Sequence, residues 1–337
     1  MLATMTDSKS RRERATRRAG EFPPAPEPLP SPVPDSHTHL DITVGQAGPV
    51  VPAGARMPET TGGRRPADPD DPAEPTGLAD RAAPADRADS TDPADPFGTA
   101  IAVAAVVGVD RLVQVGVDVE TSRFGADLAR RYDAVLATVA LHPNEAPRLA
   151  DLDEALREIE ALAGEDRVRG IGETGMDRFR TGDEGWAAQE ASFRAHIGIA
   201  KRYGKALVIH DRDAHADVLR ILDAEGAPDT VVMHCFSGDA EFAAQCVRRG
   251  YLLSFAGTVT FASAGALREA ARVTPIDQVL VETDAPYLTP VPYRGRPNAS
   301  YLIPLTVRSL AETTGTDLTD LCAAISANGD RAFGPWR

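Results

Sequence analysis

Short apolar runs rich in Val, Ile and Leu recur along most of the chain, and longer amphipathic stretches separate them. The runs predict seven β-strands, at residues 111–117, 134–143, 168–177, 206–212, 230–238, 251–257 and 279–287. A shorter run that ends at His37 predicts one more strand. Between the strands, stretches such as 151–164 have the apolar spacing of helices. Near-continuous apolar strands that alternate with helices are typical of a parallel sheet covered on both faces.

The number of these units favours a closed sheet. Eight strand–helix units in about 240 residues predict a (β/α)8 TIM barrel, because that fold places eight parallel strands in about 250 residues. An open, doubly wound parallel sheet is the alternative architecture with the same local pattern.

Two segments lack the pattern. Residues 1–31 are basic and then rich in proline, whereas residues 45–95 are mainly Ala, Pro, Asp and Arg without one aromatic residue. Chain with so few apolar side chains cannot offset the entropy cost of ordering its backbone. We therefore expect 1–31 to be a disordered tail, and 45–95 to be a disordered insertion in a single barrel domain of residues 32–337.

Composition restricts the partners and the compartment. The net charge of −14 argues against a surface that coats nucleic acid nonspecifically. No apolar run approaches the roughly 18 residues of a membrane span, and no apolar segment follows the basic N-terminal residues as in a signal peptide. The three cysteines make no paired framework and fit a reducing compartment. We expect a cytoplasmic protein, monomeric by default, with no membrane contact.

The candidate chemistry lies at the ends of the predicted strands. In a barrel the carboxyl ends of all strands meet at one face, where active sites form. One histidine near a strand end is usually an ordinary polar residue, but ligand-type side chains at many strand ends of one barrel indicate a metal site. They are His37, His39, His142, Glu173, His210, His234 and Asp284. The other two histidines, His196 and His215, fall in helical stretches and are interpreted as packing or surface residues.

The number of ligands suggests two ions. Four imidazoles (His37, His39, His210 and His234) and two carboxylates (Glu173 and Asp284) exceed the needs of one four- or five-coordinate ion. They suit two divalent ions bridged by a carboxylate, which together activate water. Mixed imidazole and carboxylate ligation accommodates Mg, Mn or Zn, and the sequence does not choose among them. Asp284 can also accept a proton from the water between the ions, as a general base.

The motifs DSHTHLD, ALHP, GETGMD, VIHDRDA, HCFSG and ETDAPYL, in this order, resemble those of the TatD family of metal-dependent deoxyribonucleases. The resemblance covers residues 33–44 and 97–335, and it implies a TIM barrel of the amidohydrolase type. It also implies that His37, His39, Glu173 and Asp284 hold one metal. Glu173 would then bridge to a second metal completed by His210 and His234, while His142 and Arg212 would face the phosphate of a DNA substrate.

Besides the insertion at 45–95, the chain departs from the family pattern at two places. Arg178-Phe179 replaces a frequent aromatic pair, and RPNAS at 296–300 stands where many members have RNEP. Many amidohydrolases bridge their metals with a carboxylated lysine on strand 4, but this barrel contains only Lys201 and Lys205, which favours Glu173 as the bridge. The alternatives to a DNase are an amide, lactone or ester hydrolase, such as a D-aminoacyl-tRNA deacylase, and a non-catalytic binding protein.

Overall fold

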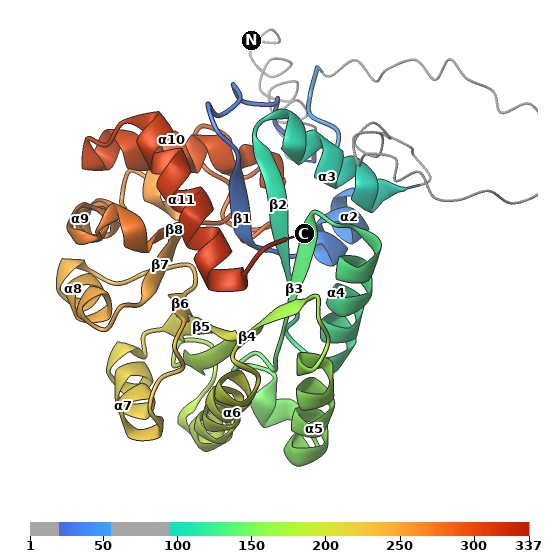
Figure 1. Ribbon diagram of the computed structural model, residues 1–337, viewed down its shortest axis with the longest axis vertical. Helices are drawn as coiled ribbons and strands as arrows, with labels where there is room; N and C mark the ends of the chain where they lie inside the picture. The colour runs from blue at the N-terminus through green and yellow to red at the C-terminus, as the bar shows by residue number, and fades with distance from the viewer. Residues whose placement is uncertain (1–19, 55–94, 337) are drawn as a thin grey trace, which may run out of the picture.

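A computed structural model describes residues 20–54 and 95–336. Its centre is a sheet of eight parallel strands in the order of the sequence, with the helices on the outside (Figure 1). The strands are β1 (Val33–Thr38), β2 (Val109–Val115), β3 (Val135–Val139), β4 (Val168–Asp177), β5 (Ala206–Arg212), β6 (Val231–Met233), β7 (Leu252–Phe255) and β8 (Val279–Val281). The predicted (β/α)8 TIM barrel is confirmed.

The barrel closes beyond the end of β8. The Asp284 N–H donates to the His37 carbonyl at 3.0 Å, and the His39 N–H donates to the Ala285 carbonyl at 2.9 Å. Thr38 and Ala285 form a parallel bridge. The last stretch of sheet pairing therefore joins the two chain segments that carry His37, His39 and Asp284.

Ten α-helices lie in the described ranges. They are α2 (Leu40–Ala47), α3 (Pro96–Val106), α4 (Val119–Arg131), α5 (Leu152–Ala163), α6 (Asp183–Tyr203), α7 (His215–Glu225), α8 (Ala240–Arg248), α9 (Gly265–Val273), α10 (Ile303–Thr314) and α11 (Leu318–Phe333). Five of them begin after an aspartate whose carboxylate accepts a backbone N–H of the first turn, which stabilises a helix start; these are Asp95, Asp118, Asp151, Asp239 and Asp317. None of the helices in the described ranges is long and apolar enough to cross a bilayer.

The amino end of the barrel is closed by the end of the chain. Phe333 and Trp336 pack in one buried cluster with strand residues such as Val113 and Val208. Arg167, just before β4, donates to the Trp336 carbonyl at 2.5 Å. Figure 1 shows α11 crossing this end of the barrel, so the carboxyl ends of the strands are left as the other mouth.

Parts of the two segments that were predicted to be disordered are ordered in the structure. Residues 20–31, assigned to the tail, are held by buried Phe22 and Leu29 and by a 2.6 Å hydrogen bond from the Tyr301 hydroxyl to the Pro23 carbonyl. Residues 45–54 belong to α2 and to a following segment in which Val50 is buried. A few buried apolar side chains are enough to hold these polar segments against the barrel. Residues 1–19 and 55–94 of the two segments lie outside the described residues.

Candidate metal centre

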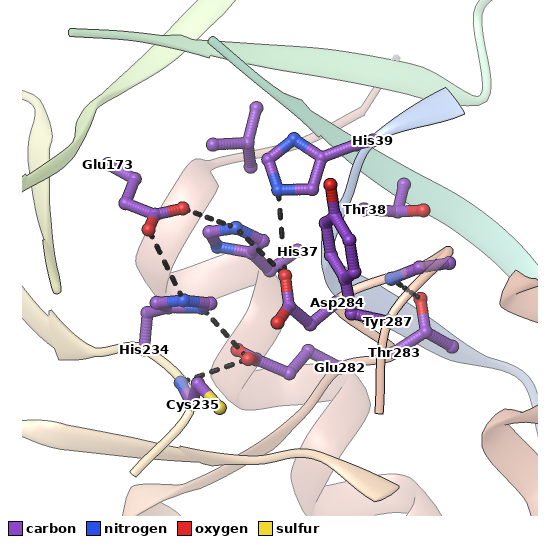
Figure 2. A network of polar contacts seen from close by, with 12 residues as sticks. His37, Thr38, His39, Glu173, His234, Cys235, Glu282, Thr283, Asp284 and Tyr287 are labelled. Atoms are coloured by element: carbon purple, nitrogen blue, oxygen red, sulfur yellow. Dashed lines mark hydrogen bonds and ion pairs between the residues drawn. The ribbon is translucent and has the colours of Figure 1, made fainter. Parts of the chain in front are cut away.

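All six candidate metal ligands meet at the carboxyl mouth of the barrel. His37 lies in β1, Glu173 in β4 and His210 in β5. His39 and His234 each follow the last residue of a strand, and Asp284 stands three residues after β8. Figure 2 shows most of this cluster, with Glu173 on one side and Asp284 on the other.

Glu173 is the centre of the arrangement. Its Oε2 lies 3.0 Å from His37 Nε2, and its Oε1 lies 2.9 Å from His210 Nδ1 and 3.7 Å from His234 Nε2. The same Oε1 lies 3.0 Å from His142 Nε2. The side chain is almost completely buried. One carboxylate thus faces imidazoles from four strands or strand ends, as a bridging ligand would.

Two glycines allow Glu173 to reach this place. A Cβ added to Gly172 would lie 2.4 Å from Val208 Cβ, and one added to Gly175 would lie 2.1 Å from the His210 carbonyl oxygen. Gly175 also has a φ of +142°, which residues with side chains rarely adopt. The two glycines therefore let β4 lie against β5 closely enough to set Glu173 beside His210.

Asp284 faces the opening of the site. Its Oδ1 is 3.5 Å from His39 Nε2 and 3.9 Å from His37 Nε2, and its side chain is 16% exposed. The residue before it, Thr283, donates its N–H at 2.9 Å and its hydroxyl at 2.6 Å to the buried carboxylate of Asp35. The first aspartate of DSHTHLD therefore positions the segment that carries Asp284.

Two further carboxylates lie behind the histidines, and the sequence reasoning did not single them out. Glu282 is fully buried, with its Oε1 2.8 Å from His234 Nδ1 and accepting the Cys235 N–H at 2.9 Å. Asp177 has its Oδ2 3.3 Å from His210 Nε2. Carboxylates on the far nitrogen of a metal-binding imidazole fix its orientation and raise its basicity. Both residues lie within motifs named above, ETDAPYL and GETGMD, and these motifs could have pointed to them.

His142 is oriented as a hydrogen-bond donor. Its Nδ1 accepts the backbone N–H of Asn144 at 3.0 Å. A neutral imidazole whose Nδ1 accepts must carry its proton on Nε2, the atom that faces Glu173. Although His142, Glu173 and His210 are close enough together to form a metal-binding group, this tautomer favours donation to an oxygen atom over metal ligation.

The charges in the metal-free site are set by burial and by close pairing. Burial lowers the pKa of His210, but the hydrogen bonds to Asp177 and Glu173 outweigh it and bring the pKa to about 9. For His234, burial is outweighed by Glu282 and Glu173, and the pKa is about 10. Burial raises the pKa of Glu173, yet the surrounding imidazoles hold it well below its usual value. Without metal, protons on two histidines therefore balance part of the carboxylate charge.

The residues fit a divalent metal. The Nδ1 atom of the fully buried His37 has no hydrogen-bond partner among the described residues, and its Nε2 lies between two carboxylates, 3.0 Å from Glu173 Oε2 and 3.9 Å from Asp284 Oδ1. Ligand atoms of His37, His39 and Glu173 lie within 4.8 Å of one another, as do those of His234, Cys235 and Asp284. Imidazole and carboxylate ligands of this kind suit Zn or Mn and, with waters, Mg. A buried cluster of carboxylates and imidazoles is costly unless protons or a metal ion balance its charge.

The predicted substrate residue Arg212 is not part of the buried cluster. It ends β5, is exposed, and holds its guanidinium carbon 4.3 Å from the centre of the Phe179 ring. The two histidines assigned to packing or surface roles lie outside the cluster. His196 is buried in α6 and accepts the Leu141 N–H at 3.0 Å, while His215 pairs with Asp211.

Known proteins are similar to this chain in sequence and in fold. The profile of a family described as TatD related DNase matches residues 88–334. The uncharacterized metal-dependent hydrolase TatD of Mycobacterium tuberculosis is 47% identical over 235 residues, covering 68% of this chain and 88% of the relative. The 3′-5′ ssDNA/RNA exonuclease TatD of Cronobacter sakazakii is 35% identical over 240 residues, covering 69% of this chain and 90% of the relative.

Among solved structures, the crystal structure of YJJV, a TatD homolog from Escherichia coli K12, matches with a TM-score of 0.68 and 25% identity. The match covers 74% of this chain and 96% of that one. These findings confirm the family that the motifs predicted: the chain belongs to the TatD family of metal-dependent hydrolases.

Proposed function

We propose that the protein hydrolyses phosphodiester bonds of DNA, as a 3′-5′ exonuclease on single strands, with two divalent ions held around Glu173. The observation that carries the proposal is the contact of this one buried carboxylate with imidazoles of His37, His210 and His234. The name of the Cronobacter sakazakii relative supports the choice of substrate.

The metal ligands of the proposal are the six residues of the cluster. His37, His39 and Asp284 would hold one ion, His210 and His234 the other, and Glu173 both. Divalent ions in these positions would act as Lewis acids toward a phosphate and a water molecule.

The chain's own residues supply the remaining chemistry. Asp284, as the partly exposed carboxylate of the cluster, would accept the proton of the attacking water, a role that contributes about 10² to 10⁴-fold in rate. His142 Nε2–H points into the cluster and would donate to a phosphoryl oxygen, where negative charge builds up in the transition state. Glu282 and Asp177 would hold the rings of His234 and His210 in the orientation that metal binding needs.

The test compares three classes of substrate, namely single-stranded DNA, a lactone and a D-aminoacyl-tRNA, with one enzyme preparation. A 3′-labelled and a 5′-labelled single-stranded oligonucleotide, a lactone and a D-aminoacyl-tRNA are each incubated with the protein, with and without EDTA. We expect stepwise shortening of the oligonucleotide from its 3′ end, abolished by EDTA and restored by Mn, Mg or Zn. Hydrolysis of the lactone or the tRNA ester without cleavage of DNA would contradict the proposal.

Metal content tests the two-ion part separately. Protein purified without chelator, loaded with Mn or Zn and freed of excess metal should contain two ions per chain, and Glu173→Ala should reduce binding at both positions. A maximum of one ion per wild-type chain would contradict the two-ion site while leaving the hydrolase assignment in place.

A further inference from the structure

Two large aromatic side chains stand exposed on the rim of the metal centre. Phe179, two residues after β4, is 63% exposed, and Tyr287, six residues after β8, is 50% exposed. The Tyr287 ring centre lies 6.4 Å from that of His39, and Figure 2 shows the ring beside Asp284. Exposed aromatic rings next to a reaction centre are candidates for contact with the substrate.

Phe179 is tied to the metal centre through its backbone. Its N–H and that of Arg180 both donate to Asp177 Oδ1 at 2.8 Å. The other oxygen of Asp177 lies 3.3 Å from His210 Nε2. One carboxylate therefore orients a candidate metal ligand and fixes the start of the segment that presents the exposed ring. The backbone that presents the ring is therefore fixed close to a candidate metal ligand.

The cation beside this ring has no carboxylate partner. Arg212 covers one face of Phe179 and makes no ion pair within the described ranges. Its neighbour Arg178 differs, since it is paired with Asp217 and lies over Trp186 at 3.7 Å. A guanidinium without a carboxylate partner is available to bind a phosphate.

The combination of ring and guanidinium matches a single-stranded nucleotide. Bases of any sequence stack on aromatic rings and on Arg planes, but only when they are unpaired. An arginine can lie flat on a ring and still donate its edge N–H groups to a phosphate oxygen. A base in the interior of a duplex offers no free face, so a surface of this kind selects single strands and frayed ends.

We propose that Phe179 and Arg212 form a base-stacking surface that holds the nucleotide next to the cleaved phosphate of a single-stranded DNA end. This inference rests on the proposed nuclease function and adds the feature that recognises the substrate. Phe179 contributes the ring on which the base stacks, and Arg212 contributes the charge for the adjoining phosphate.

The binding test uses a signal that only stacking changes. An oligonucleotide with 2-aminopurine at its 3′ end is titrated with metal-free protein in EDTA, so that no cleavage occurs. We expect the fluorescence to be quenched on binding to wild type and to Phe179→Tyr, and to remain unquenched with Phe179→Leu, which keeps the apolar bulk without the ring. Tyr203→Leu is the matched control, because Tyr203 is a partly exposed aromatic at the end of α6 outside the candidate site.

The kinetic test compares a normal strand with one whose 3′-terminal nucleotides are abasic. Phe179→Leu should lower kcat/KM about 5- to 150-fold on the normal strand, which corresponds to the loss of about 1–3 kcal/mol of stacking per base. On the abasic strand Phe179→Leu and wild type should agree. Arg212→Gln should lower kcat/KM on both strands, because the phosphate is present in each.

The outcomes separate this inference from the proposed function. If wild type cleaves DNA and Phe179→Leu matches it in quenching and in kcat/KM, the stacking surface is refuted and the nuclease assignment stands. Equal losses on normal and abasic strands would also refute it, because the ring would then act on something other than the base. If wild type cleaves no DNA under any metal, the nuclease function fails. Quenching that depends on Phe179 would then still support binding of single strands.

Discussion

Replacing Asp284 by Asn tests the catalytic base with little change in shape. The backbone N–H of Asp284 donates to the His37 carbonyl at 3.0 Å, and this bond does not involve the side chain. The residue has a φ of 53°, a conformation that Asn tolerates about as well as Asp. The substitution therefore removes one negative charge and one basic oxygen while the fold around it is kept.

Two losses are expected, and metal concentration separates them. A charge about 4 Å from the Asp284 carboxylate, the range of the contacts to His39 and His37, interacts with it by about 4 kcal/mol at an effective dielectric constant of 20. Asn keeps only the dipolar part of this attraction, so metal should bind more weakly. At saturating metal the remaining loss reflects the base, and we expect kcat on single-stranded DNA to fall at least about a hundredfold.

The matched control is Asp213→Asn. Asp213 has a φ of 56°, is exposed and lies directly after β5. It therefore undergoes the same chemical change in the same backbone conformation, and it should keep the wild-type kcat. If Asp284 served only to hold its turn, Asp284→Asn would cost about 1 kcal/mol of unfolding free energy and keep its activity. A kcat near that of wild type at saturating metal would remove the general-base role.

Three further predictions concern the support of the site. Glu282→Gln should weaken metal binding by about 10- to 100-fold in a competition titration, since it loosens His234; unchanged affinity would contradict the orienting role. Gly175→Ala should lower the thermal midpoint and the metal content together, because the added Cβ meets the His210 carbonyl at 2.1 Å; wild-type values of both would contradict the close approach of β4 and β5. In EDTA, stability should fall as the pH rises from 6.5 through 9 to 10. His210 and His234 have folded pKa values of about 9 and about 10 against 6.5 unfolded, so their protons stabilise the fold fully below 6.5. A thermal midpoint that does not fall over this range would contradict the pairing of these histidines with carboxylates. For the same reason, metal binding near pH 8 should release about two protons per chain, which calorimetry can measure.

The bounds of a strand were predictable where its apolar run in the sequence has the same length as its hydrogen-bonded pairing in the sheet. The predicted ranges 168–177 and 206–212 are those of β4 and β5. The ranges 230–238 and 279–287 shrink to β6 and β8, at Val231–Met233 and Val279–Val281. Beyond these points the chain continues as HCFSG and ETDAPY, and the backbone turns away from the ladder, with φ of 43° at Cys235 and 53° at Asp284. Such turns present His234 and Asp284 to the mouth, and hydrophobic periodicity carries no signal for them.

Order in the N-terminal segment was missed for a different reason. Composition averages over many residues, whereas the segment 20–31 is held by single contacts. Phe22 and Leu29 are buried, and the Arg296 guanidinium donates to the Glu21 carbonyl at 2.8 Å. Arg296 and Tyr301, which bind the Glu21 and Pro23 carbonyls, lie more than two hundred positions away, outside any local sequence window.

The positions of the candidate ligands were predictable from the sequence, but the orientation of their rings was not. Strand ends and period-2 alternation place His37, Glu173 and His210 at one mouth whatever the rotamers are. What a histidine does there depends on which nitrogen is satisfied from behind. Carboxylates lie at His210 Nε2 and His234 Nδ1 and leave the opposite nitrogen of each ring facing Glu173. For His142 a backbone N–H lies behind Nδ1 instead, which forces the proton onto Nε2 and makes this histidine a donor to oxygen.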